Sequence, residues 1–95
     1  MEITKTYRIK PRANLDDAYL SEQDLSEADL KDASLEGTFL EEANLSNANL
    51  VGANLNVAQM RNACLENSNL TNAVLSGANL YGANLKNANL QAADL

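Results

Sequence analysis

The chain has 95 residues, with 13 acidic and 7 basic side chains, no histidine, one cysteine and a net charge of −6. Its length limits it to one domain, and its acidity argues against nucleic-acid binding. Without histidine it lacks the usual general base and the commonest metal ligand, and a single cysteine excludes an intramolecular disulfide.

Residues 1–12 differ in pattern from the rest of the chain. Ile3, Tyr7 and Ile9 alternate with polar residues, which is the two-residue period of a strand. We expect this segment to be an amino-terminal cap over the repeats that follow, and its net charge of +3 makes it the only basic cluster. The chain shows neither the apolar core of a secretory signal nor a run of about eighteen apolar residues. These features predict a cytoplasmic protein that does not engage a membrane.

Residues 13–95 repeat a five-residue unit without interruption. Leucine stands at every fifth position from Leu15 to Leu95, and Met60 fills the one gap. Alanine comes two residues earlier in fourteen of the seventeen units, and asparagine or aspartate lies between the two in eleven. Repetition of this kind is typical of a solenoid.

A period of five fits neither a helix nor a straight strand. On a helix each step of five turns by about 140°, so the leucines would form no stripe. On a strand successive leucines would point to opposite faces. The period instead predicts short extended pieces separated by corners, with Ala and Leu inside. Four corners per coil would place Tyr19 under Phe39 and Glu22 under Glu42.

The tandem A-[ND]-L-x-x pattern resembles the pentapeptide repeat family. The resemblance covers residues 13–95 and implies an all-β fold, a right-handed quadrilateral β-helix of about four coils with four repeats in each. Leu and the preceding Ala would face inward. Gln23, Thr38 and Ser68 replace that Ala, and we expect Gln23 to tolerate an inside position in the first coil.

The last coil would present an apolar layer with no polar segment after it. A solenoid end of this kind needs a cover. Three covers are open: a homodimer formed end to end, another repeat-bearing chain, or further residues of a chain cut short. Members of the family with a known activity dimerise through one end of the rod. The candidate end-to-end interface is Leu80, Leu85, Leu90 and Leu95.

Ten acidic residues against one lysine make residues 13–45 strongly acidic, whereas residues 46–95 are balanced. All ten should point outward, with Asp16 beneath Glu36 at a coil spacing of about 5 Å. Three interpretations stay open: a solvated face, a surface for a basic groove that imitates nucleic-acid phosphates, or a cation site between carboxylates. The candidate acidic surface is Asp16, Asp17 and Glu36.

Tyr19 and Phe39 should stack on one face, with Tyr81 further along the same face. A stacked aromatic pair stabilises a sheet locally, and it can also anchor a partner protein. The candidate partner patch is Tyr19, Phe39, Glu22, Glu41 and Glu42.

No residue set suggests catalysis, a cofactor or a metal site. Cys64 lies outward without a histidine to activate it, and the interior is filled by Leu and Ala, which leaves no pocket. The sequence therefore predicts a non-catalytic structural or protein-interaction module with an unknown protein partner. The resemblance implies one alternative, a DNA mimic that binds gyrase and modulates quinolone action. Compared with such members, this chain has about half the coils, and its acids gather near one end.

Overall fold

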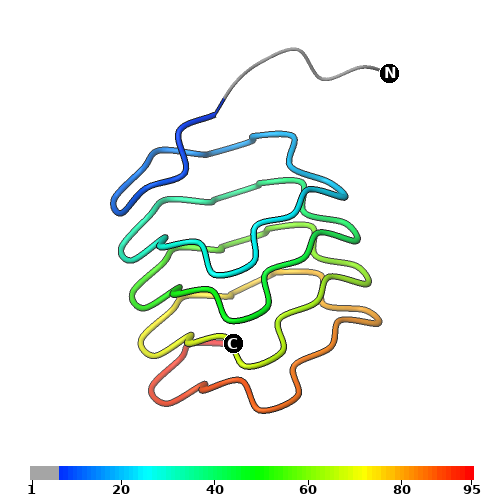
Figure 1. The fold of residues 1–95 in the computed structure, drawn as a ribbon. Helices are drawn as coiled ribbons and strands as arrows, with labels where there is room; N and C mark the ends of the chain where they lie inside the picture. Colours follow the sequence, from blue (N-terminus) through cyan, green and yellow to red (C-terminus); the bar gives the residue numbers. More distant parts are fainter. Residues whose placement is uncertain (1–6) are drawn as a thin grey trace.

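The computed structural model describes residues 7–95 (Figure 1), and the first six residues lie outside the described part. From residue 13 the chain winds as stacked four-sided coils, running from one end of the stack to the other. Each coil is joined to the next by parallel bridges between residues twenty apart, from Asn14↔Ser34 to Val74↔Asp94. The predicted coil of four repeats is therefore confirmed.

The sides of the coil are shorter than ordinary strands. Residues 7–95 contain no helix and no strand of several residues, because each side contributes one bridging residue, the one between Ala and Leu. The cause is the two-residue corner on either side of every three-residue piece. Backbone hydrogen bonds still join successive coils, because the Leu15 N–H donates to the Ser34 carbonyl at 2.7 Å and the Ser34 N–H donates to the Ala13 carbonyl at 2.9 Å.

Every corner has the same backbone conformation. The N–H of the residue after the corner donates to the carbonyl of the residue before it, as in Ala18 to Leu15 at 3.0 Å. The second corner residue has a positive φ at every corner from Arg12 to Ala92, the sign pattern of a type II turn. All four glycines of the chain stand at this position. At Gly52 a Cβ would also collide with the Asp32 carboxylate of the preceding coil.

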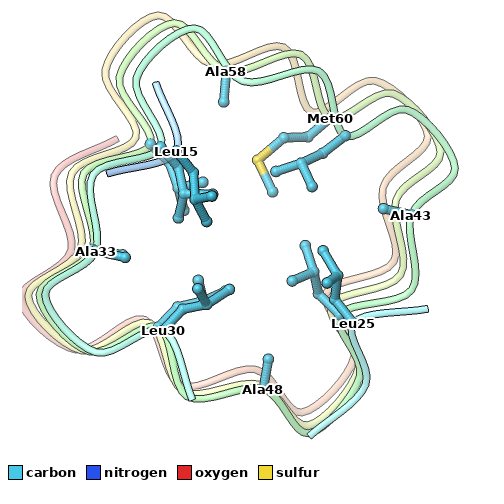
Figure 2. Close-up of a cluster of buried hydrophobic side chains, with 14 of the residues drawn as sticks. Leu15, Leu25, Leu30, Ala33, Ala43, Ala48, Ala58 and Met60 are labelled. Atoms are coloured by element: carbon cyan, nitrogen blue, oxygen red, sulfur yellow. The ribbon is translucent and has the colours of Figure 1, made fainter. Parts of the chain in front are cut away.

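The core is a set of inward columns that run along the stack. Leu30, Leu50 and Leu70 are fully buried, and Met60 fills its leucine position with no exposed surface. Figure 2 shows leucine or methionine side chains alternating with alanines around the inside of the stack, so that each side of the coil directs one large and one small side chain inward. Each buried leucine stabilises the fold by roughly 1.5–3 kcal/mol.

The three polar substitutes for alanine behave differently. The Thr38 hydroxyl donates to the Leu15 carbonyl of the preceding coil at 2.8 Å, and the Ser68 hydroxyl donates to the Leu65 carbonyl at 2.7 Å. Both residues are buried, and no buried polar side-chain atom within residues 7–95 lacks a partner. Gln23 is exposed, so the expectation that it would lie inside is wrong. Gln23 belongs to the first coil, where no preceding coil covers its column.

The two ends of the stack differ in what lies against them. Tyr7 and Ile9 pack against the core at the first coil, and the Tyr7 hydroxyl accepts a hydrogen bond from the Tyr19 N–H at 3.2 Å. Ile3, the other apolar residue of the predicted cap, lies outside the described residues. At the last coil Leu80, Leu85 and Leu90 are half-buried and Leu95 is 71% exposed. End-to-end association through this layer stays a prediction.

Candidate interaction surface

The residue between Ala and Leu points outward and usually fixes the next corner. Its side-chain oxygen accepts a hydrogen bond from the N–H two residues later, as Asn49 does from Val51 at 3.1 Å and Asn54 from Asn56 at 2.9 Å. The arrangement is an Asx turn, in which the side-chain oxygen and not a water molecule accepts the hydrogen bond of the corner N–H. The residues that form it are Asn14, Asp24, Asp29, Asn44, Asn49, Asn54, Asn69, Asn79, Asn84 and Asn89.

On one of the four faces, most of the central residues do not form this corner bond. We call this face the aromatic face, and its outward column is Tyr19, Phe39, Gln59 and Asn79. We call the opposite face the amide face, and its column is Asp29, Asn49, Asn69 and Asn89. Every residue of the amide face forms the corner bond, whereas on the aromatic face only Asn79 does. Of the four faces, the aromatic face departs most from the pattern that stabilises the corners.

The two aromatic rings of this face lie on each other. The Tyr19 and Phe39 ring centroids are 4.8 Å apart, and the ring planes are 5° from parallel. The Tyr19 side chain is 48% exposed, and Phe39 is half-buried. The predicted stack is therefore present and accessible from solvent.

Tyr81 does not lie on the aromatic face as expected. It stands at a corner, in the same position as Ser21, Glu41 and Arg61 in the preceding coils. The Arg61 guanidinium lies 5.5 Å from the centre of the Tyr81 ring. The expectation is wrong because residue 81 is the first residue after a leucine, and that position begins a corner.

Two acidic corners flank the aromatic stack in the first two coils. One corner precedes the face, and the other follows it. The preceding corner carries Asp16, Asp17 and Glu36, and the following corner carries Glu22, Glu41 and Glu42. Five of these six residues are exposed, Glu41 is half-buried, and none has an ion-pair partner within residues 7–95. The fold thus gathers the candidate patch and the candidate acidic surface around one aromatic pair.

Hydrogen bonds orient two of the six carboxylates. Asp16 accepts from the Glu36 N–H at 3.0 Å and from the Ser34 hydroxyl, and Glu41 accepts from the Ser21 hydroxyl at 2.8 Å. Ser34 lacks the amide that caps a corner, so the Asp16 carboxylate of the preceding coil caps that corner instead. These bonds partly offset the like-charge repulsion that the stacked sequence predicts.

Other outward groups form no further site. Within the described part of the chain no three Asp, Glu, Cys or His side chains converge closely enough to hold a metal ion. Cys64 is a partly exposed free thiol in the column of Asp24, Asn44 and Asn84. No helix among residues 7–95 is long and apolar enough to cross a membrane.

The repeats match a known protein family. The family model for pentapeptide repeats fits residues 13–42, 24–56, 40–77 and 58–95. The chain belongs to the pentapeptide repeat family. Proteins of this family are generally non-catalytic, and the fold that the family implies is the right-handed quadrilateral β-helix. The resemblance seen in the sequence is confirmed.

Solved structures of cyanobacterial pentapeptide repeat proteins are similar to this chain. Rfr23 from Cyanothece 51142 is 33% identical with a TM-score of 0.65, over 81% of this chain and 59% of its own. HetL from Nostoc sp. strain PCC 7120, a protein involved in heterocyst differentiation regulation, is 32% identical with a TM-score of 0.40, over 87% and 47%. Alr5209 from Nostoc PCC 7120 is 36% identical with a TM-score of 0.41, over 86% and 60%.

This pentapeptide repeat chain spans less than two thirds of each of these similar proteins. No curated protein matches it.

Sequence reasoning found the patch but missed what makes this face distinct from the others. The sequence shows asparagine or aspartate at eleven of the seventeen central positions, and the period alone does not say what these side chains do. Because asparagine and aspartate cap turns two residues on, the same letters could have identified the corner bond and the face on which only Asn79 forms it.

Proposed function

We propose that this pentapeptide repeat protein is a non-catalytic interaction module whose protein partner docks on the aromatic face. The observation that carries the proposal is the exchange of corner-capping amides for an accessible aromatic pair at Tyr19 and Phe39. The exchange removes hydrogen bonds from backbone N–H groups to side chains that the amide face keeps. We therefore expect the aromatic pair to contribute to binding and not to stability. We expect no cofactor, nucleic acid or membrane to take part.

Aromatic side chains are well suited to this role. Tyrosine provides a large contact area at low entropic cost, and it is enriched among the residues that dominate binding energy. Tyr19 is half exposed and is already ordered by the stack with Phe39. A partner that covers the pair would gain apolar burial without having to order flexible side chains.

Affinity capture from a cyanobacterial lysate tests the proposal. The tagged full chain is compared with the double variant Tyr19→Ala, Phe39→Ala and with Tyr81→Ala. Tyr81 is the matched control, because it is an exposed tyrosine outside the aromatic column. The wild type and the control should retain the same protein at similar levels. The double variant should retain at least about tenfold less of that protein. Equal retention by all three would contradict the proposal.

DNA mimicry directed at gyrase is the second candidate function. The observation in its favour is the set of six carboxylates without ion-pair partners on two neighbouring corners. We place it second because these carboxylates occupy only two coils, and the outward charges of residues 46–95 balance. A surface that imitates a DNA duplex needs negative charge along its whole length.

A further inference from the structure

We propose that the segment that docks on the aromatic face is a basic polypeptide in which arginine makes the central contacts. This inference rests on the proposed function and specifies the chemistry of the partner. The site consists of the Tyr19–Phe39 stack together with the acidic corners on either side of it.

The charges around the stack demand a cationic partner. The corner before the face and the corner after it each contribute three carboxylates in the first two coils, namely Asp16, Asp17 and Glu36, and Glu22, Glu41 and Glu42. None of them is paired with a base in the part of the chain that the structure describes. An anionic or neutral partner would desolvate these groups without compensation, which costs free energy. A basic segment would pair with both corners as it crosses the face.

The aromatic pair selects arginine over lysine. A guanidinium is planar and weakly hydrated, packs on aromatic rings, and can bind a carboxylate through two parallel hydrogen bonds. Its aliphatic stem can lie on the Tyr19 and Phe39 rings while its head reaches a neighbouring corner. The protein already contains a contact of this kind, because the Arg61 guanidinium lies against the Tyr81 ring.

Other occupants fit the surface less well. A metal ion is not favoured, because no three ligating side chains converge within residues 7–95. A nucleic acid would bring its phosphates onto the six carboxylates. Arg61 of this chain, two coils on from Ser21 in the same corner column, is turned toward Tyr81 and leaves the carboxylates of the first two coils open.

Fluorescence anisotropy with the full chain tests the inference. The probe is a fluorescein-labelled peptide in which arginine alternates with glycine, and two further peptides replace arginine by lysine or by citrulline. The arginine peptide should bind at least about threefold more tightly than the lysine peptide, and the neutral citrulline peptide should not bind. Raising the salt from about 0.05 M to about 0.3 M should weaken binding, because the Debye length shortens.

Matched variants locate the peptide on the protein. Glu22→Gln with Glu42→Gln should weaken binding about fivefold, and Tyr19→Ala with Phe39→Ala should weaken it about tenfold. The control is Glu27→Gln with Asp32→Asn, which removes the same charge from exposed, positive-φ corner positions beside the amide face. The control should change the affinity by less than about twofold.

Two results would overturn the inference. One is equal weakening by the acidic pair and by the control, which would mean that the peptide senses net charge alone. The other is no binding of the arginine peptide to the wild type. Neither result bears on whether the lysate partner depends on Tyr19 and Phe39, so failure of the inference is distinguishable from failure of the proposed function.

Discussion

Val57 occupies a corner position that β-branched residues rarely adopt. Its φ is 52°, and all other residues at this position are glycine or residues without a branched Cβ. The left-handed conformation costs an L-residue roughly 1–2 kcal/mol, and asparagine tolerates it best after glycine. The next coil adapts to Val57 through Gly77, where a Cβ would lie 3.0 Å from the Val57 Cγ1 atom.

Replacing Val57 by asparagine should therefore stabilise the protein. We expect Val57→Asn to raise the free energy of unfolding by about 1 kcal/mol, since the side chain is 46% exposed and little apolar burial is lost. Urea denaturation measures the change. The reciprocal variant Asn67→Val, at the second position of another corner, should lower the free energy of unfolding by about the same amount. A Val57→Asn protein that is less stable than the wild type would contradict the strain argument.

Hydrogen bonds from Ser26 lower the pKa of the Asp24 carboxyl. The Ser26 hydroxyl, at 2.7 Å, and then the Ser26 N–H, at 3.0 Å, hold the pKa of Asp24 below its ordinary value of 3.8. Both groups donate to the ionised carboxylate and so favour it. Since the folded pKa is lowered, this contribution to stability is present above pH 3.8 and is lost as the pH falls through the folded pKa.

Ser26→Ala should raise the pKa of Asp24 toward 3.8, because the larger of the two causes is removed. An NMR titration of the Asp24 carboxyl carbon measures it. Ser46→Ala is the control, because Ser46 holds the equivalent corner position one coil later beside the neutral Asn44. An Asp24 titration unchanged by Ser26→Ala would show that the hydroxyl does not favour the carboxylate.

At the scale of the repeat, the corner bond explains why asparagine or aspartate belongs between alanine and leucine. The side-chain oxygen holds the N–H that begins the next corner, so the amide stabilises the turn from the outside while leucine stabilises it from the inside. Where the amide is missing, the corner keeps its own backbone hydrogen bond and the bonds between coils, and at Glu36 the Asp16 carboxylate takes the place of the amide. The outward position is therefore not free on every face.

Asn54→Ala should lower the free energy of unfolding by about 0.5–1.5 kcal/mol, because the Asn56 N–H loses its acceptor. Gln59→Ala, at the next central position, should change it by less than about 0.5 kcal/mol, since Gln59 forms no such bond. Thermal or urea unfolding of the two variants measures the difference. Equal effects would mean that the corner amide does not stabilise the turn.

The five-residue period predicts much of this architecture. It places Leu15 to Leu95 inside, and the twenty-residue columns predict the Tyr19–Phe39 stack. It could not predict the direction of outward side chains, since Asp16 turns to the Glu36 N–H only because Ser34 leaves that corner without a cap. Gln23 was misplaced because burial in a column also depends on a neighbouring coil. Tyr81 could have been placed correctly from its position after Leu80.

At the scale of the whole molecule, the acidic residues gather at one end of the stack, and six of the ten in residues 13–45 lie at the corners on either side of the aromatic pair. The acidic corners lie in the first two coils, beside the aromatic face, whereas the later coils carry balanced charge. The amide face, on the opposite side, uses all of its central residues to stabilise corners. This division separates a surface that serves the fold from a surface that is available for a partner.

The same distribution predicts the outcome of a gyrase assay. We expect no inhibition of supercoiling and no protection from a quinolone up to tens of micromolar protein, because two acidic coils are too short to imitate a DNA duplex. A supercoiling assay with and without the drug measures both effects. Inhibition at micromolar protein that weakens when Glu36, Glu41 and Glu42 are neutralised would instead favour DNA mimicry.

Site-specific photo-crosslinking tests the central claim, that one face of the coil carries the function. A photoreactive phenylalanine analogue is placed on each face in turn in the full chain, and the crosslinks to other proteins in cells are compared. The four positions are Phe39 on the aromatic face, Asn69 on the amide face, and Cys64 and Val74 on the other two. We predict a discrete crosslinked partner from position 39 and none from the other three. The same partner captured from Asn69, on the opposite side of the coil, would contradict the claim.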